Sequence, residues 1–197
     1  EYKIEKEATD YQLYYFVDKY NIWSLLGNPF YLIKMLELYN RNKELFTSLT
    51  EVLKHLISIE SIDKFHDPSD EILILEKSIR FLGFLSYNLN YNADANWTVT
   101  CDRPLFYDLL CKFINSDDQQ QLVNISKILL KTDLIRYHEG TFYFSKEIYS
   151  IYFAYYYINF QCNKKEEVFN VIYNHNKWLN IIILLSFDLD KKVMRRI

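Results

Sequence analysis

The stretch LIRYHEGTFYF, residues 134–144, differs in periodicity from the segments around it. Apolar side chains recur at every second position, at Ile135 and Tyr137 and again at Phe142 and Phe144, on either side of a turn that contains Gly140. Alternation of this kind around a glycine predicts two short antiparallel strands joined as a β-hairpin. The flanking segments instead show the three-to-four-residue spacing of apolar side chains that is typical of helices.

Three helices are predicted upstream of the hairpin. The clearest break in the chain is Asp67-Pro68-Ser69-Asp70, which combines a proline with helix-capping residues. A helix over 71–89 is expected after it, then a polar, Asn-rich loop over 88–100, a helix over 103–114, and a third helix that starts near Asp117-Asp118. Its expected apolar face consists of Leu122, Ile125, Ile128 and Leu129. Three helices followed by a hairpin is the order of elements in a winged-helix domain.

A strongly aromatic helix is predicted directly after the hairpin, with Ser145 as its N-cap. Its apolar side chains are spaced to share one face. They are Ile148, Tyr149, Tyr152, Phe153 and Tyr156. We expect this helix to be the core of the unit, with Phe144 and Phe153 deeply buried. The alternative is an exposed tyrosine platform that stacks nucleic-acid bases.

Helices are also expected in the remaining segments. The apolar spacing predicts them over 10–20, 29–40 and about 49–57, where Thr47 or Ser48 would be the cap, and in the tail over 166–175 and 177–187. The whole sequence has only 3 Gly and 3 Pro, which favours long helices with few tight corners. The predicted fold class is therefore mainly α with one short β-hairpin.

Composition and charge exclude several classes of protein. The longest apolar run, 178–187, is about half of what a bilayer span requires, so no membrane partner is expected. The three cysteines are far apart and form no CxxC pair, as expected of reduced thiols in a cytoplasmic protein. Because the chain begins at Glu1 and has no basic-then-apolar leader, we expect a piece of a longer intracellular protein.

No catalytic centre is predicted. The sequence has neither GxxxxGKS/T nor GxGxxG for binding phosphates, no HExxH and no GxSxG, and its four histidines are isolated from one another. We therefore expect no catalytic residue, no metal site and no enzymatic activity in this chain. The net charge is −3, and residues 67–162 carry 8 basic against 12 acidic side chains. The predicted third helix offers only Lys127 and Lys131 and the hairpin only Arg136, so no nucleic-acid partner is expected.

Three segments carry a resemblance to a known family. LLGNPFYLIKML, residues 25–36, resembles the Asn-Pro-hydrophobic segment that follows the ATPase core in NACHT-type STAND nucleotide-binding proteins. YFSKEIYSIYFAYYY, residues 143–157, is similar to the pattern that closes the winged-helix domain of that family. The helix of residues 178–185 resembles the tryptophan-led helix that commonly follows. The motifs are mainly hydrophobic, and the resemblance that they carry spans most of the chain.

The resemblance implies a domain organisation and a role. It implies a helical lid over 1–66, a winged-helix domain over 67–162 and the start of a second helical domain over 163–197. This region would be the regulatory part of a STAND ATPase switch in signalling or defence. Its partner would be the upstream ATPase core of the same chain, with self-association on activation.

The resemblance also implies two nucleotide-binding residues. Pro29 would lie against ATP or ADP that is bound by the ATPase core. Lys146 occupies the place of the histidine that touches the terminal phosphate of ADP, and Ser150-Ile151 replaces the family's Gln-Glu pair. These departures put the histidine contact in doubt, although a lysine cation can still meet a phosphate as a point charge. The alternative function is a non-catalytic helical interaction module that is unrelated to nucleotides.

Overall fold

The computed structural model describes residues 33, 49–62, 70–91, 96–116, 118–162, 168, 172 and 176–188. The chain divides into two compact units, Glu1–Leu56 and Ile57–Ile197, and each is described by itself. Most of the described residues are helical, and a small antiparallel sheet lies in the second unit. None of the helices described is long and apolar enough to cross a membrane. The predicted domain boundaries at 66 and 162 adjoin residues outside the described ranges and stay a prediction.

The first unit is described at residue 33 and along part of α4 (Leu49–Ile62), which crosses the division between the units. Four members of the predicted apolar stripe are buried, namely Val52, Leu53, Leu56 and Ile57. The spacing of these side chains therefore predicted this helix correctly.

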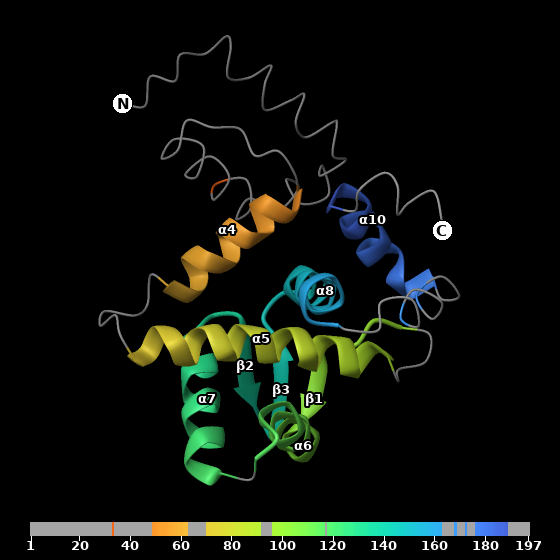
Figure 1. Cartoon of the computed structure of the whole chain (residues 1–197). Helices are drawn as coiled ribbons and strands as arrows, with labels where there is room; N and C mark the ends of the chain where they lie inside the picture. The colour runs from red at the N-terminus through yellow and green to blue at the C-terminus, as the bar shows by residue number, and fades with distance from the viewer. Residues whose placement is uncertain are drawn as a thin grey trace, which may run out of the picture. The chain divides into compact units, whose positions relative to one another are not determined.

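Helix α5 (Asp70–Tyr91) is the central element of the second unit. It packs most extensively against α8 (Glu147–Tyr156) and α7 (Gln119–Lys131), and it also contacts α6 (Arg103–Ile114). Figure 1 shows α5 running between α8 on one side and α6, α7 and the sheet on the other.

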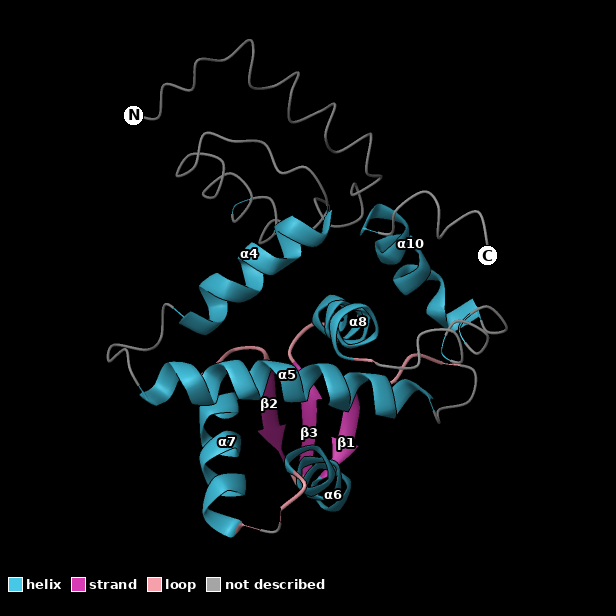
Figure 2. Ribbon diagram, viewed as in Figure 1, coloured by secondary structure: helices cyan, strands magenta, loops and turns pink. Residues whose placement is uncertain are grey.

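The sheet has three strands (Figure 2), one more than the sequence predicted. The predicted hairpin consists of β2 (Ile135–His138) and β3 (Thr141–Phe144), and β1 (Thr100–Asp102) pairs with the other edge of β3. The strand order is therefore β1-β3-β2. The loop predicted over 88–100 is wrong at residue 100, where β1 begins. The preceding helix also runs two residues beyond the predicted end at residue 89.

Local sequence explains how these elements begin and turn. Glu139 and Gly140 have φ values of 47° and 82°, as the two central residues of a type I′ hairpin turn require. The Asp102 carboxylate accepts a hydrogen bond from the amide of Leu105 and caps α6, while Asp118 caps α7 in the same way. This cap confirms the predicted start of the third helix near Asp117-Asp118.

The core of the second unit is aromatic. Phe106 of α6 stacks on Phe142 of β3 with ring centroids 3.8 Å apart, and Phe81 of α5 meets Phe106 edge-to-face at 5.3 Å. Phe144 and Phe153 are 3 % and 0 % exposed, which confirms that the aromatic helix is core. The predicted single buried face is wrong, because Ser150, Ile151, Ala154 and Tyr155 are buried as well. Helix α8 is thus enclosed on nearly all sides.

The tail begins with a change of helical geometry. Residues Tyr157–Gln161 continue α8 as a π-helix, η1, which ends at Gln161. A short 3-10 helix, η2 (Asn176–Trp178), leads into α10 (Leu179–Asp188), which packs on α8. Trp178 is fully buried, and its ring meets that of Trp97 edge-to-face at 5.2 Å. The helix predicted over 166–175 lies almost wholly outside the described residues.

Candidate functional site

The start of α8 is held against the loop that follows α7. The amide of Ser145 donates to the carbonyl oxygen of Leu134 at 3.0 Å, and the Ser145 hydroxyl donates to the carbonyl oxygen of Asp133. Ser145 is therefore not the N-cap that the sequence predicted, because its hydroxyl is used on a neighbouring loop. The N-cap is Lys146, which has φ −144° and ψ 137° and makes no capping hydrogen bond through its side chain. A cationic residue therefore stands at the start of α8.

The ammonium group of Lys146 is held by an aromatic neighbour. Its Nζ donates to the hydroxyl oxygen of Tyr149 at 2.9 Å and lies 4.8 Å from the centroid of the same ring. Tyr149 is fully buried and Lys146 is half-buried, so the cation is fixed at the edge of the core. A cation in this position can meet a phosphate or a carboxylate as a point charge. Pro29, the other predicted nucleotide-binding residue, lies outside the described residues.

One turn further on, a buried polar cluster fixes α8 to α5. The Ser86 hydroxyl donates to the Ser150 carbonyl oxygen at 2.7 Å and lies 2.8 Å from the Ser150 hydroxyl, to which the Trp97 indole also donates at 3.2 Å. Both serines are fully buried, and these bonds satisfy polar groups that would otherwise be costly to bury. Sequence reasoning missed this cluster, although a serine in the middle of each of two apolar helices was the available signal.

A second buried side chain fixes the approach to the sheet. The amide nitrogen of Asn90 donates to the carbonyl oxygen of Thr98 at 2.9 Å, and its carbonyl oxygen accepts from the Thr98 backbone amide at 2.7 Å. These two hydrogen bonds resemble those between paired strands of a sheet, with the Asn90 side-chain amide in place of a backbone amide. It holds residue 98 just before β1, so the last turn of α5 positions the extra strand.

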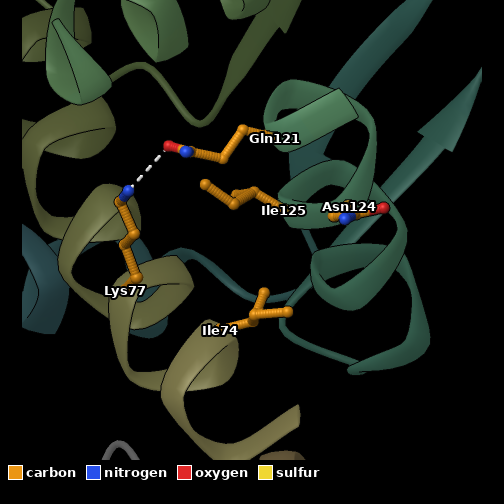
Figure 3. Close-up of a pocket in the computed structure, with 5 residues that line it drawn as sticks. All are labelled: Ile74, Lys77, Gln121, Asn124 and Ile125. Atoms are coloured by element: carbon orange, nitrogen blue, oxygen red, sulfur yellow. Dashed lines mark hydrogen bonds between the residues drawn. The ribbon is translucent and has the colours of Figure 1, made fainter. Parts of the chain in front are cut away.

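A small hollow opens between α5 and α7 (Figure 3). It has a volume of about 200 Å³ and is lined by Ile74, Lys77, Gln121, Asn124 and Ile125. Lys77 Nζ donates to Gln121 Oε1 at 2.8 Å across its edge, and the rest of the lining is almost wholly apolar. Pockets for drug-sized ligands occupy roughly 300–1,000 Å³, so this hollow is too small for a nucleotide.

In the described ranges, no three His, Cys, Asp or Glu side chains come together as a metal site. Burial, and secondly the neighbouring Asp102 carboxylate, raise the pKa of the Cys101 thiol to about 12. A protonated thiol is a poor nucleophile, so Cys101 is suited to packing. Lys127 and Lys131 are both exposed on α7, and Arg136 is exposed on β2.

Comparison of this chain with protein-family models, with curated proteins and with solved structures finds no match in any of the three.

Proposed function

We propose that residues 67–162 form a winged-helix domain that acts as the regulatory part of a NACHT-type STAND ATPase switch. The order of elements supports the domain assignment, since α5 is followed by β1, α6, α7 and the β2–β3 hairpin. The central place of β3 between the other two strands supports it as well. In this proposal α7 takes the third-helix position and the β2–β3 hairpin is the wing.

The observation that carries the functional proposal is the setting of Lys146. The sequence resemblance places this residue where the family contacts the terminal phosphate of ADP. Lys146 is the N-cap residue of α8, and the hydrogen bond to Tyr149 fixes the direction of its side chain. The ammonium group is therefore pre-positioned instead of freely sampling solvent. A charge that is already held in place loses little conformational entropy when it meets an anion.

The proposed mechanism is a change in population between two arrangements. ADP held by an upstream ATPase core would touch Pro29 and Lys146, and this bridge would favour a closed form. Loss of the bridge, or its replacement by ATP, would free the winged-helix domain to rotate and expose surfaces for self-association. Nucleotide shifts this equilibrium only by the difference in its affinity for the two forms. Hydrolysis would belong to the core, and this region itself would not be an enzyme.

The test is ADP binding by the full-length gene product, measured by isothermal titration calorimetry. Lys146→Ala should weaken ADP binding about tenfold or more, because hydrogen bonds to charged groups contribute about 1.5–3 kcal/mol. Lys146→Arg should retain part of the affinity. The matched control is Lys112→Ala on α6, an exposed lysine that pairs with Asp108.

Two results would count against the proposal. An ADP affinity that is equal in wild type and Lys146→Ala would remove Lys146 from the nucleotide site. A full-length protein that binds no nucleotide would favour the alternative, a non-catalytic helical interaction module.

A further inference from the structure

Two adjacent side chains at the end of η1 lie in environments that do not suit them. Phe160 is 64 % exposed, although residues 149–155 of the preceding helix are all buried. Gln161 is the reverse case, because its amide nitrogen is buried and has no hydrogen-bond partner among the described residues. An exposed aromatic ring forfeits the free energy of its burial, and a buried donor without a partner is costly. Both costs arise in the same turn of helix.

The Gln161 amide lies in apolar surroundings beside Gly83 of α5. A Cβ atom added at Gly83 would be 3.5 Å from Gln161 Nε2 and 3.3 Å from Tyr157 Cβ. The rings of Phe84 and Tyr87, on either side along α5, lie 5.8 and 4.8 Å from that of Tyr157. An aromatic side chain suits this position beside Gly83 better than a primary amide does.

The spacing of the sequence favours Phe160 for this position. Phe153, Tyr157 and Phe160 follow i, i+4, i+7 spacing, which places three side chains on one face of an α-helix. Phe153 and Tyr157 are the two residues of this helix that approach α5 most closely at its glycine. Continued α-helical winding would therefore direct Phe160 toward α5, where the structure instead has Gln161.

The π-helix accounts for this exchange of neighbours. The Cys162 amide donates to the Tyr157 carbonyl oxygen at 2.8 Å, so the bond spans five residues instead of four. In α-helical winding the Gln161 amide would donate to that oxygen, and Gln161 would take the place that Cys162 has now. Phe160 would then take the place of Gln161. The rotation accumulates along the turn, so it is small at Ile158, which is fully buried near the start of η1.

We infer that η1 is a two-state switch between π-helical and α-helical winding. In the π-helical state, which the structure shows, Phe160 faces solvent and Gln161 lies beside Gly83. In the α-helical state Phe160 lies beside Gly83 and the Gln161 amide leaves this position. The winding thus decides whether an aromatic side chain is available to a partner at the surface or is withdrawn into the core. The switch depends on η1 and α5 and does not require bound nucleotide.

Each state has advantages, so neither excludes the other. The π-helical state keeps the ring contact between Tyr156 and Phe160, at 5.2 Å, and needs no room for a phenyl ring beside Gly83. The α-helical state buries that ring and releases the unpaired amide of Gln161. Opposing effects of this kind leave a minor state that is populated at roughly 0.1–10 %.

The test places 4-fluorophenylalanine at residue 160 of the full 197-residue chain and records ¹⁹F relaxation dispersion and saturation transfer. These methods detect exchange on the μs–ms timescale of helix register shifts. We expect exchange with a minor state whose chemical shift lacks the dependence on D₂O that the exposed ring shows. The same label at residue 153, which is fully buried in α8, is the control site and should show no exchange.

Substitutions of Gln161 should shift the two populations in opposite directions. Gln161→Glu places a carboxylate where the amide was, which is costlier to bury, so the α-helical population should rise at least about threefold. Gln161→Leu removes the unpaired donor and should lower that population at least about threefold. The matched control is Gln119→Glu, at an exposed position of α7, which should leave the population unchanged. Thermal melts establish that each variant is folded, and Gln161→Leu tests the proposal even if Gln161→Glu does not fold.

Three outcomes would overturn the proposal. The first is a label at residue 160 that shows a single exposed state in both the wild type and Gln161→Glu. The second is a minor state whose ring is as exposed to solvent as that of the major state. The third is a population that responds equally to Gln161→Glu and Gln119→Glu, which would separate the exchange from the position beside Gly83.

Discussion

Gly83 lies at a close contact of α5 with α8 and the π-helix that follows it, and its substitution by alanine tests the central packing of the fold. A Cβ atom added at this position would be 3.2 Å from the carbonyl oxygen of Phe153 and 3.3 Å from Cβ of Tyr157. Both distances are tighter than ordinary van der Waals contacts. Neither neighbouring atom belongs to the flexible end of a side chain, so relief requires a movement of the α8 backbone.

Two effects of opposite sign decide the outcome. Alanine in a helix interior is favoured over glycine by about 0.8–1.0 kcal/mol, which alone would stabilise the protein. Inserting a methyl group into a well-packed core typically costs about 1–3 kcal/mol. Because α8 is enclosed on nearly all sides and cannot shift outward freely, we expect the packing cost to win, with a net loss of about 1 kcal/mol. For a chain of this size that loss lowers Tm by about 2–4 °C.

The assay is thermal and urea unfolding of the full chain followed by circular dichroism at 222 nm. Gly140→Ala is the matched control, because its Cβ would meet no atom within 4 Å and any loss there arises from the φ of +82° alone. Gly83→Leu should be several times more destabilising than Gly83→Ala. A Gly83→Ala protein with a Tm above that of wild type would refute the close contact between α5 and α8.

Three further outcomes follow from the same core. Phe153→Ala should cost about 3–5 kcal/mol in unfolding free energy, because its side chain is fully buried. Phe160 is 64 % exposed, so Phe160→Ala should cost less than about 0.5 kcal/mol. Equal Tm shifts in the two variants would contradict the burial of Phe153. Ser150→Ala should cost about 1–3 kcal/mol because it removes the hydroxyl oxygen that accepts from the Trp97 indole, while Ser86 keeps its bond to the backbone carbonyl of residue 150. The double variant with Ser86→Ala should cost less than the sum of the two single variants, and strict additivity in a double-mutant cycle would show that the two hydroxyls do not interact. The Cys101 thiol has an ordinary pKa of 9.0 in the unfolded chain and a pKa of about 12 in the folded protein. Between these two values the free energy of unfolding should therefore fall as pH rises, by roughly 1.4 kcal/mol per pH unit. In Cys101→Ala the urea midpoints measured from about pH 8 to 11 should depend less on pH, and parallel curves for the variant and wild type would reject the shift.

Elements with local signals were predictable from the sequence. The Asp118 carboxylate, the turn at Gly140 and the helix over 103–114 depend on residues within four positions of one another. Helix caps and hairpin turns depend on residues within that distance, so the local sequence is enough to predict where these elements begin and turn. The burial of Phe144 and Phe153 was predictable for the same reason, since side-chain spacing reports which positions face a core.

Elements that depend on distant partners were not predictable. Strand β1 spans only Thr100–Asp102 and is extended because it pairs with β3, about forty residues later. Ser145 has the composition of a helix cap, yet its hydroxyl bonds to Asp133, twelve residues earlier. In each case a tertiary contact overrode a local preference, as it commonly does where a short segment has several possible partners.

The candidate site was accessible only in part. The sequence points to Lys146 only through the family resemblance and not through periodicity, because a lone lysine after a strand has no pattern of its own. The hollow between α5 and α7 has no sequence signature at all, since its two sides are 44 residues apart where Lys77 meets Gln121. A cavity forms where two packed surfaces leave a space between them, so the spacing of residues along one helix cannot predict it.

The arrangement of α8 bears on how any event at Lys146 would be transmitted. The helix begins at this lysine, is bonded to α5 through Ser150 one turn later, and meets Gly83 at Phe153 and Tyr157. A close-packed helix with hydrogen bonds near one end and backbone contact near the other can shift little without disturbing its neighbours. The π-helix that begins at Tyr157 forms part of this contact, and such irregular turns are frequent at functional sites. If a bound anion displaced Lys146, the contact at Gly83 and the π-helix turn would be disturbed as well. Gly83→Ala therefore probes the coupling between Lys146 and this contact as well as the packing of the two helices.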